Sequence, residues 1–244
     1  MRDLILFGLL IILLLVAQFA SAKTVDEIIE RYLRARGGND KLASVKSIYM
    51  EGTKEMMGKE IKIKITKEQD KLSRTDIETG EGKYIMLITD KGACTFFPVG
   101  STAVDKIPDE DLAALQTEMD ITGPLTDYIA KGHKAELMGK DTVGDKTCYK
   151  IKVTTKAGQE MMFWVDAATY LVNQSSTTTI WASRGVDPET FTIYGNYKEV
   201  GGIQFAHTVE TKTNSSNGAE ICEETFFHTI MVNPTIDPKM YQPE

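Results

Sequence analysis

The spacing of apolar positions in the first part of the chain is that of an α-helix. Between residues 25 and 33, apolar side chains recur at i, i+3, i+4, i+7 and i+8, which places them on one helical face. Thr24 and Glu27 form a capping box at the start of this stretch, and Gly37-Gly38 provides a stop signal. The pattern predicts an amphipathic helix with one buried face, followed by a short helical turn that begins at Asn39.

From residue 48 onward, apolar residues recur at every second position. Ile61-Lys62-Ile63-Lys64-Ile65 alternates strictly, which indicates a strand with one buried and one wet face. Short turn signals such as Gly58 and Asp90-Lys91-Gly92 separate this stretch from similar ones, as in an antiparallel meander. The strands predicted in this block are 48–53, 61–65, 72–77, 83–89 and 93–98.

Residues 107–132 interrupt the strand pattern. Pro108 stands where a helix can begin, and Gly123-Pro124 breaks the stretch in two. The apolar positions on either side of the break are Leu112, Leu115 and Met119, then Leu125, Tyr128 and Ile129. This spacing predicts two short, weakly amphipathic helices with a flexible joint, a pattern typical of a cover over an apolar surface.

A second block of strands runs from residue 135 to about residue 232. The strands predicted there are 136–139, 148–154, 161–165, 171–179, 191–197, 203–211 and 221–232. The sequence contains no linker, low-complexity tract or clear internal repeat. We therefore expect residues 23–244 to form one domain in which both blocks contribute to the same antiparallel sheet.

The first 22 residues have the pattern of a secretory signal peptide. Arg2 precedes an apolar run from Leu4 to Val16, which is shorter than the ~20 residues of a membrane-spanning helix. Ala20-Ser21-Ala22 then matches the small-residue rule for signal peptidase. The sequence predicts cleavage after Ala22 and export to the periplasm, and an uncleaved membrane anchor is the alternative.

The composition narrows the possible partners. The 244-residue chain carries a formal net charge of −7, and an acidic surface repels phosphate backbones and anionic lipid headgroups. The length is sufficient for a substantial hydrophobic core. We therefore expect a soluble monomer that does not bind nucleic acid.

The motifs of common enzymes and metal sites are missing from the sequence. His133, His207 and His228 have no metal-ligand spacing, and no nucleophile elbow, phosphate-binding loop or dinucleotide fingerprint occurs. The sequence thus predicts no catalytic residue, no metal and no cofactor, although a hydrolase that uses His207 remains an alternative.

The three cysteines, Cys94, Cys148 and Cys222, match no zinc or redox motif. In an exported chain they can form one disulfide and leave one thiol, or they can be three buried thiols.

Two predicted strands are apolar on both faces. Residues 84–88 and 161–165 have almost no polar side chains, whereas one face of an antiparallel sheet usually meets water. Such strands need cover on both sides, which the first helix, residues 107–132 or a bound apolar ligand can supply. The chain also holds 11 methionines, whose flexible side chains adapt to irregular apolar partners. These observations fit either a filled core or a hydrophobic cavity.

Several segments together resemble the LolA-like group of periplasmic outer-membrane lipoprotein-sorting and carrier proteins. The resemblance rests on the following segments: Ala35 to Leu42, Lys71-Leu72-Ser73-Arg74, Tyr84 to Gly92, the helical interruption, Cys148 to Val153, and Phe163-Trp164-Val165-Asp166. The resemblance implies a mainly β fold: a single curved antiparallel sheet, or open half-barrel, with an N-terminal helix and two helices over its concave face. It also implies that Arg74 holds the helical lid closed through hydrogen bonds.

The resemblance further implies a soluble periplasmic carrier that binds acyl chains of lipoproteins or lipids and moves them between membrane-bound donor and acceptor proteins. The alternative is a non-enzymatic envelope sensor of the same fold that binds a regulatory protein. The residues predicted to line the apolar cavity are Ile63, Ile65, Tyr84, Met86, Ile88, Phe96, Phe163 and Trp164 from strands, and Leu112, Leu115, Leu125 and Ile129 from the lid. A register error of one residue would exchange the two faces of any strand.

Overall fold

The computed structural model describes residues 23–56, 58–80, 82–97, 104–183, 185–214 and 219–243. The predicted signal peptide and its cleavage site at Ala22 lie outside these ranges and stay predictions. Among the helices of the described residues, none combines the length and the apolar character that a membrane crossing requires.

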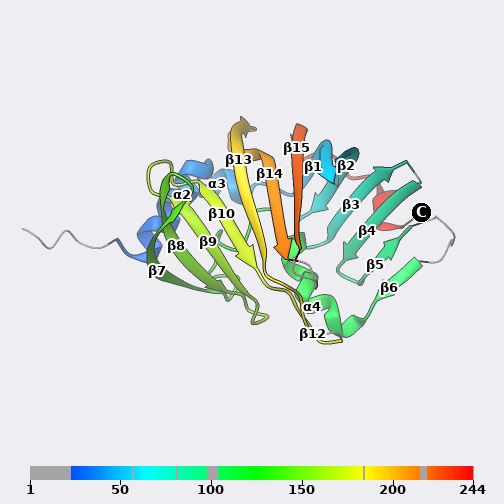
Figure 1. Cartoon of the computed structure of the whole chain (residues 1–244), viewed down its shortest axis with the longest axis horizontal. Helices are drawn as coiled ribbons and strands as arrows, with labels where there is room; N and C mark the ends of the chain where they lie inside the picture. Colours follow the sequence, from blue (N-terminus) through cyan, green and yellow to red (C-terminus); the bar gives the residue numbers. More distant parts are fainter. Residues whose placement is uncertain are drawn as a thin grey trace, which may run out of the picture.

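In the described part of the chain, one antiparallel sheet of thirteen strands dominates the molecule (Figure 1). Its strands are β1 (Ser47–Met56), β2 (Lys59–Glu68), β3 (Leu72–Thr79), β4 (Gly82–Thr89), β5 (Gly92–Phe96), β6 (Val104–Ile107), β7 (Lys134–Val143), β8 (Lys146–Thr154), β9 (Glu160–Asp166), β10 (Val172–Thr177), β13 (Thr190–Val200), β14 (Ile203–Asn214) and β15 (Glu220–Val232). Two short strands, β11 (Ile180–Trp181) and β12 (Gly185–Val186), form a separate hairpin.

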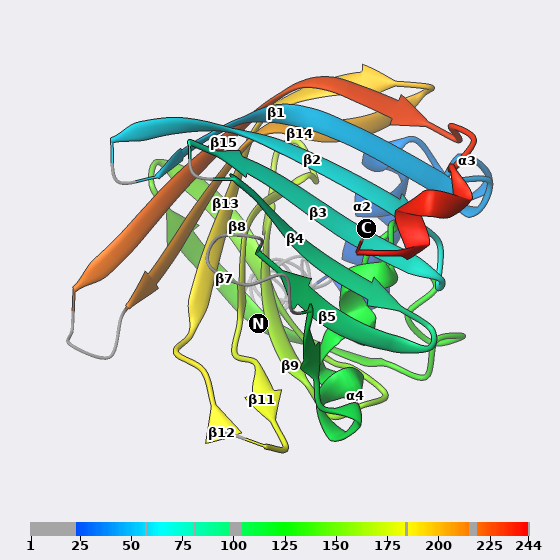
Figure 2. The same ribbon diagram turned by 90° about the vertical axis from the view of Figure 1, so that its right-hand side faces the viewer.

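The strand order shows how the two sequence blocks join. The order is β6-β5-β4-β3-β2-β1-β15-β14-β13-β10-β9-β8-β7, so adjacent strands are consecutive in sequence except where β1 pairs with β15 and where β10 pairs with β13. The edge strands β6 and β7 do not pair with each other, and the sheet stays open. Figure 2 shows the sheet curving around the helices. The predicted mainly β fold with one open antiparallel sheet is therefore confirmed.

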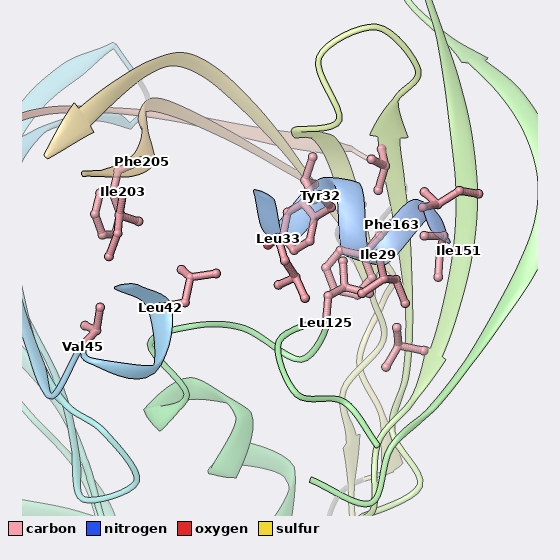
Figure 3. Packing of buried hydrophobic residues seen from close by; sticks show 14 of the residues in the cluster. Ile29, Tyr32, Leu33, Leu42, Val45, Leu125, Ile151, Phe163, Ile203 and Phe205 are labelled. Atoms are coloured by element: carbon pink, nitrogen blue, oxygen red, sulfur yellow. The ribbon is translucent and has the colours of Figure 1, made fainter. Parts of the chain in front are cut away.

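The N-terminal helix, α2 (Val25–Arg36), lies on the concave side of the sheet and begins as the sequence predicts. Thr24 and Glu27 complete the capping box, and the short helix α3 (Asn39–Ala43) follows. The buried face of α2 packs against strands and the covering loop, as Figure 3 shows for Ile29, Phe163 and Leu125. These contacts order the helix, because a helix of this length is marginal alone in water.

The join between α2 and α3 requires glycine. Gly37 has a φ of 130°, and a Cβ at this position would lie 2.3 Å from the carbonyl oxygen of Gly202. An L-residue would therefore be strained and would also collide with the turn that links β13 and β14.

The interruption at residues 107–132 differs from the two predicted helices. Its first part is a chain of single turns: η1 (Asp109–Asp111), α4 (Leu112–Leu115) and η2 (Gln116–Met119). Its second part, which we call the covering segment (residues 120–132), forms turns without a helix. Gly123, Asp127 and Gly132 all have positive φ, and an α-helix cannot continue through such residues.

The doubly apolar strand β4 is covered on both faces. Leu87 and Ile88 are adjacent and therefore point to opposite sides of the sheet. Ile88 packs with Ala93, Leu115 and Met119 on the concave side. Leu87 packs on the outer side, in a cluster with Leu72, Ile85, Ile236, Met240 and Tyr241. The outer cover is thus the C-terminal segment (residues 233–243), which includes η3 (Pro238–Tyr241).

Candidate ligand-binding cavity

A cavity of about 270 Å³ lies between the concave face of the sheet, α2 and the covering segment. Three groups of residues line it: Tyr32 and Arg36 from α2; residues 121–125 from the covering segment; and Met50, Met161, Phe163, Val172, Ser175, Tyr194, Tyr197, Gln204, Phe205, Ala206 and Val209 from the sheet. Most of these side chains are apolar, and none is acidic.

The strand register explains why these residues meet. Phe163 on β9 faces Ser175 on β10, and Tyr194 on β13 faces Val209 on β14. Directly opposed residues share a face, so these side chains all point to the concave side. The sheet curves there, and Ser175 is small, which leaves space that neighbouring side chains do not fill.

The polar groups of the cavity centre on Arg36. Its Nη1 donates to the hydroxyl of Tyr32 at 2.8 Å. The guanidinium carbon lies 5.8 Å from the ring centroids of both Tyr32 and Phe205, within cation–π range. Its Nε is buried and has no hydrogen-bond partner among the described residues.

Burial favours the neutral form of two cavity tyrosines, Tyr194 and Tyr197. Burial raises the pKa of Tyr194, and burial together with the nearby Tyr32 raises the pKa of Tyr197. The hydroxyl of Tyr197 donates to the carbonyl of Val172 at 2.8 Å, and the hydroxyls of Tyr194 and Ser175 lie 3.0 Å apart. Arg36 is therefore the charged group of the lining.

Two of the predicted lining residues, Phe163 and Leu125, border the cavity. Ile63 and Ile65 lie on the same face of the sheet within the main core but outside the cavity. The other predicted lining residues on the concave side lie near β4 and β5, away from the cavity. Met86, Ile88, Leu112 and Leu115 belong to one apolar cluster. Tyr84 on β4 pairs with Ile77 on β3. A ligand-binding role for all of these residues stays a prediction.

Three other predicted lining residues point elsewhere. Trp164 faces Lys150 on the outer side, where its Nε1 donates to Asp141 at 2.9 Å. Phe96 packs in the outer cluster under the C-terminal segment. Ile129 is 72% exposed in the turns of the covering segment. Their predicted place in the cavity is wrong, because doubly apolar strands do not reveal which face is inward.

The predicted lid-holding role of Arg74 is also wrong. Its guanidinium bonds the carboxylate of Asp76 through Nε and Nη2 at 2.9–3.1 Å. Its Nη1 donates to the carbonyl of Gln242 at 2.5 Å, and the carbonyl of Met240 lies at 3.5 Å. Arg74 thus holds the C-terminal segment on the outer face, not residues 107–132.

The sequence reasoning missed Arg36, although the sequence contains a signal. Arg36 follows Tyr32 by four residues and Leu33 by three, so it continues the buried stripe of α2. A basic residue in the last helical turn usually interacts with the helix dipole at the surface. Arg36 was therefore not predicted to point into the cavity.

The cysteines and histidines of the described residues were the other candidates for chemistry. Within the described ranges, no group of three or more His, Cys, Asp or Glu side chains could hold a metal ion. Cys94, Cys148 and Cys222 are all free thiols, so the predicted disulfide alternative is wrong. Cys222 is exposed, which also contradicts the alternative of three buried thiols. His207 bonds the carbonyl of Phe227 through Nδ1 at 2.7 Å.

Comparisons with known proteins identify the fold. No protein-family model and no curated protein matches the sequence. A LolA superfamily protein from Nitrosomonas europaea matches the structure with a TM-score of 0.58 at 11% identity, over 91% of this chain and 99% of its own. A DUF1329 family protein from Desulfovibrio piger matches with a TM-score of 0.58 at 12% identity, over 91% and 98%.

A third solved structure, a putative outer membrane lipoprotein-sorting protein domain from Vibrio parahaemolyticus, has a TM-score of 0.53 at 10% identity and covers 88% of this chain and 94% of its own. The fold places this protein in the class that has an open antiparallel β sheet with helices on its concave side. Within that class, this chain has the LolA-like fold.

Proposed function

We propose that this protein is a soluble carrier of the bacterial periplasm that binds an acyl chain non-covalently and moves it between membranes. The observation that carries this proposal is the mainly apolar cavity of about 270 Å³ between the sheet, α2 and the covering segment. The LolA-like fold supports it, because one structural neighbour is named as a lipoprotein-sorting protein domain.

The size of the cavity suits reversible binding of one chain. At about 30 Å³ for a water-sized group, 270 Å³ holds roughly nine methylene-sized groups. Burial contributes ~0.8 kcal/mol for each methylene, or about 7 kcal/mol in all before the cost of association. The binding is therefore weak enough for release to an acceptor, which a carrier needs.

The covering segment provides a way in. Its turns are held by a few polar contacts: Lys131 Nζ bonds Asp120 at 2.6 Å, Gln69 accepts from the backbone of Ile121 at 2.9 Å, and Tyr128 bonds Asp26 of α2. No long helix has to unfold for this segment to move. We propose that it opens to admit the chain and closes over it.

A cavity-filling substitution tests the proposal. Val209 lines the cavity and faces Tyr194, whereas Val186 on β12 is 65% exposed, so Val209→Phe and Val186→Phe form a matched pair. The measurement is binding of N-phenyl-1-naphthylamine, an uncharged probe that fluoresces in apolar surroundings. We expect Val209→Phe to weaken binding about tenfold or more, since overpacking costs ~1–3 kcal/mol, and Val186→Phe to have no effect.

Native mass spectrometry of the protein purified from its own host provides the second readout. A bound acyl species supports the carrier. Failure of the probe to bind, together with the absence of any acyl species, would overturn the proposal. A stoichiometric protein partner in place of lipid would favour the sensor alternative.

A further inference from the structure

Among the described residues, no carboxylate pairs with the charge of Arg36. A buried charge is costly unless it is paired and fully hydrogen-bonded. No acidic residue lines the cavity, and no ion pair to Arg36 occurs among the described residues. The guanidinium instead lies against the rings of Tyr32 and Phe205. This environment accommodates a cation without cancelling its charge.

One edge of the guanidinium has no partner. Nη1 is engaged with the hydroxyl of Tyr32, whereas Nε is buried and makes no hydrogen bond to the described residues. Nη2 has no hydrogen-bond partner among them either, and Arg36 as a whole is only partly buried. The Nε and Nη2 hydrogens of an arginine point in parallel, which is the geometry that two oxygens of one anion require.

The other residues that line this cavity provide neutral hydrogen-bonding side chains and apolar surface. Gln204 and the hydroxyls of Tyr194 and Ser175 line the same cavity as Arg36, and burial keeps the pKa of Tyr194 above its usual value. Phe163 and Val209 provide apolar lining on the sheet side. The cavity thus combines one unpaired cation, polar neutral neighbours and space for a single chain.

We propose that Arg36 binds the carboxylate of a free fatty acid through its Nε and Nη2 edge, while the acyl chain fills the apolar part of the cavity. This inference rests on the proposed function and narrows its ligand to an anionic, single-chain amphiphile. A carboxylate is small and planar, so it pairs with the open edge and leaves the limited volume to the chain.

The experiment compares ligands that share one chain and differ in charge. Decanoate, methyl decanoate and decanol are each used to displace N-phenyl-1-naphthylamine from the wild-type protein at pH 7.5. A charge-assisted hydrogen bond contributes ~1.5–3 kcal/mol, so we expect decanoate to bind roughly tenfold to a hundredfold more tightly than the two uncharged ligands. Equal affinity for all three would overturn the inference while leaving the carrier proposal intact.

A matched pair of variants on α2 assigns the effect to one residue. Arg36→Met should lose the preference for decanoate and keep the affinity for decanol. Arg34→Met removes an exposed arginine of the same helix, which pairs with Glu30, and should behave as the wild type. Retention of the decanoate preference in Arg36→Met would overturn the inference.

Two further outcomes are decisive without any variant. Tighter binding of decyl phosphate than of decanoate to the wild type would contradict the carboxylate assignment and favour a phosphate headgroup. Failure of every one of these ligands to displace the probe would overturn the inference and the carrier proposal together.

Discussion

Two arginines lie in apolar surroundings on opposite faces of the same sheet, and their partners differ completely. Arg74 on the outer face is 3% exposed, bonds both oxygens of Asp76 and donates to the backbone of the C-terminal segment. Arg36 on the concave face bonds one tyrosine hydroxyl and has a buried donor without a partner among the described residues. The first arrangement is complete within the chain, and the second has room for an added anion.

This difference separates a structural role from a binding role. A buried ion pair that is fully hydrogen-bonded makes the fold depend on both of its members, because loss of either leaves an uncompensated charge. An arginine without a carboxylate partner contributes less to the stability of the fold, and its free donors can bind a ligand. Substitutions at the two positions should therefore have opposite consequences for stability and for binding.

The largest effect is expected on the outer face. Asp76→Ala leaves the buried guanidinium of Arg74 without its counter-charge, and we expect a loss of about 3–5 kcal/mol in the free energy of unfolding in urea. Glu78→Ala is the control, because Glu78 lies on the same strand in a half-exposed pair with Lys64, and its loss should cost under ~1 kcal/mol. A similar small cost for both variants would show that the Arg74–Asp76 pair is not the key contact of this face.

The second prediction compares the two covers of the sheet. Leu125 of the covering segment is 1% exposed and lines the cavity, whereas Met240 of the C-terminal segment is only partly buried. We expect Leu125→Ala to lower the free energy of unfolding by about 2–3 kcal/mol and Met240→Ala to cost about half of that. Both are measured by urea denaturation, and the reverse order would mean that the covering segment packs too loosely to close the cavity.

The third prediction concerns the loss of folding stability at low pH. Burial alone would raise the pKa of Asp76, but its hydrogen bonds and charge interactions with Arg74 and Lys83 outweigh burial and hold it below the ordinary value of 3.8. The folded protein then binds fewer protons at Asp76 than the unfolded chain does. This contribution to stability is complete above pH 3.8 and is lost as the pH falls through the lowered pKa.

Thermal unfolding between pH 7 and pH 3 measures this loss, with Asp76→Asn as the comparison. The variant should show a flatter decline below pH 4, because it has no carboxylate to protonate at this position. An identical decline in both proteins would place the acid sensitivity elsewhere, for example at Asp120, whose pKa is also lowered: its bonds with Lys131 outweigh burial.

Much of the fold could be predicted from the sequence because its signals are local. The strict alternation of residues 61–65 and the short turns predicted an antiparallel sheet, and the capping box predicted the start of α2. The open form of the sheet was implied only by the resemblance to the LolA-like group. The prediction of a helix in the second half of the interruption at residues 107–132 was wrong. Leu125, Tyr128 and Ile129 have helical spacing, but the left-handed backbone of Asp127 prevents a helix and turns Ile129 outward.

The site was harder to predict because it depends on register and on distant segments. In β4 and β9 both faces are apolar, so alternation could not place Trp164 outside and Phe163 inside. The inward position of Arg36 depends on the surroundings that β13 and β14 bring to the end of α2, including Tyr197 and Phe205. The spacing of Arg36 from Tyr32 and Leu33 indicates only its side of the helix, and not which distant residues surround it there.

The smallest stability effect is expected at Arg36. Arg36→Met removes the hydrogen bond to Tyr32 and two cation–π contacts, but it also removes the cost of keeping an unpaired charge in an apolar cavity. These contributions oppose each other, and we expect a net change within about 1 kcal/mol in the free energy of unfolding. With decanoate present, the wild type should gain stability by ligand linkage and the variant should gain less. A cost as large as that of Asp76→Ala would instead make Arg36 a second structural arginine, because the fold would then depend on its charge without any ligand.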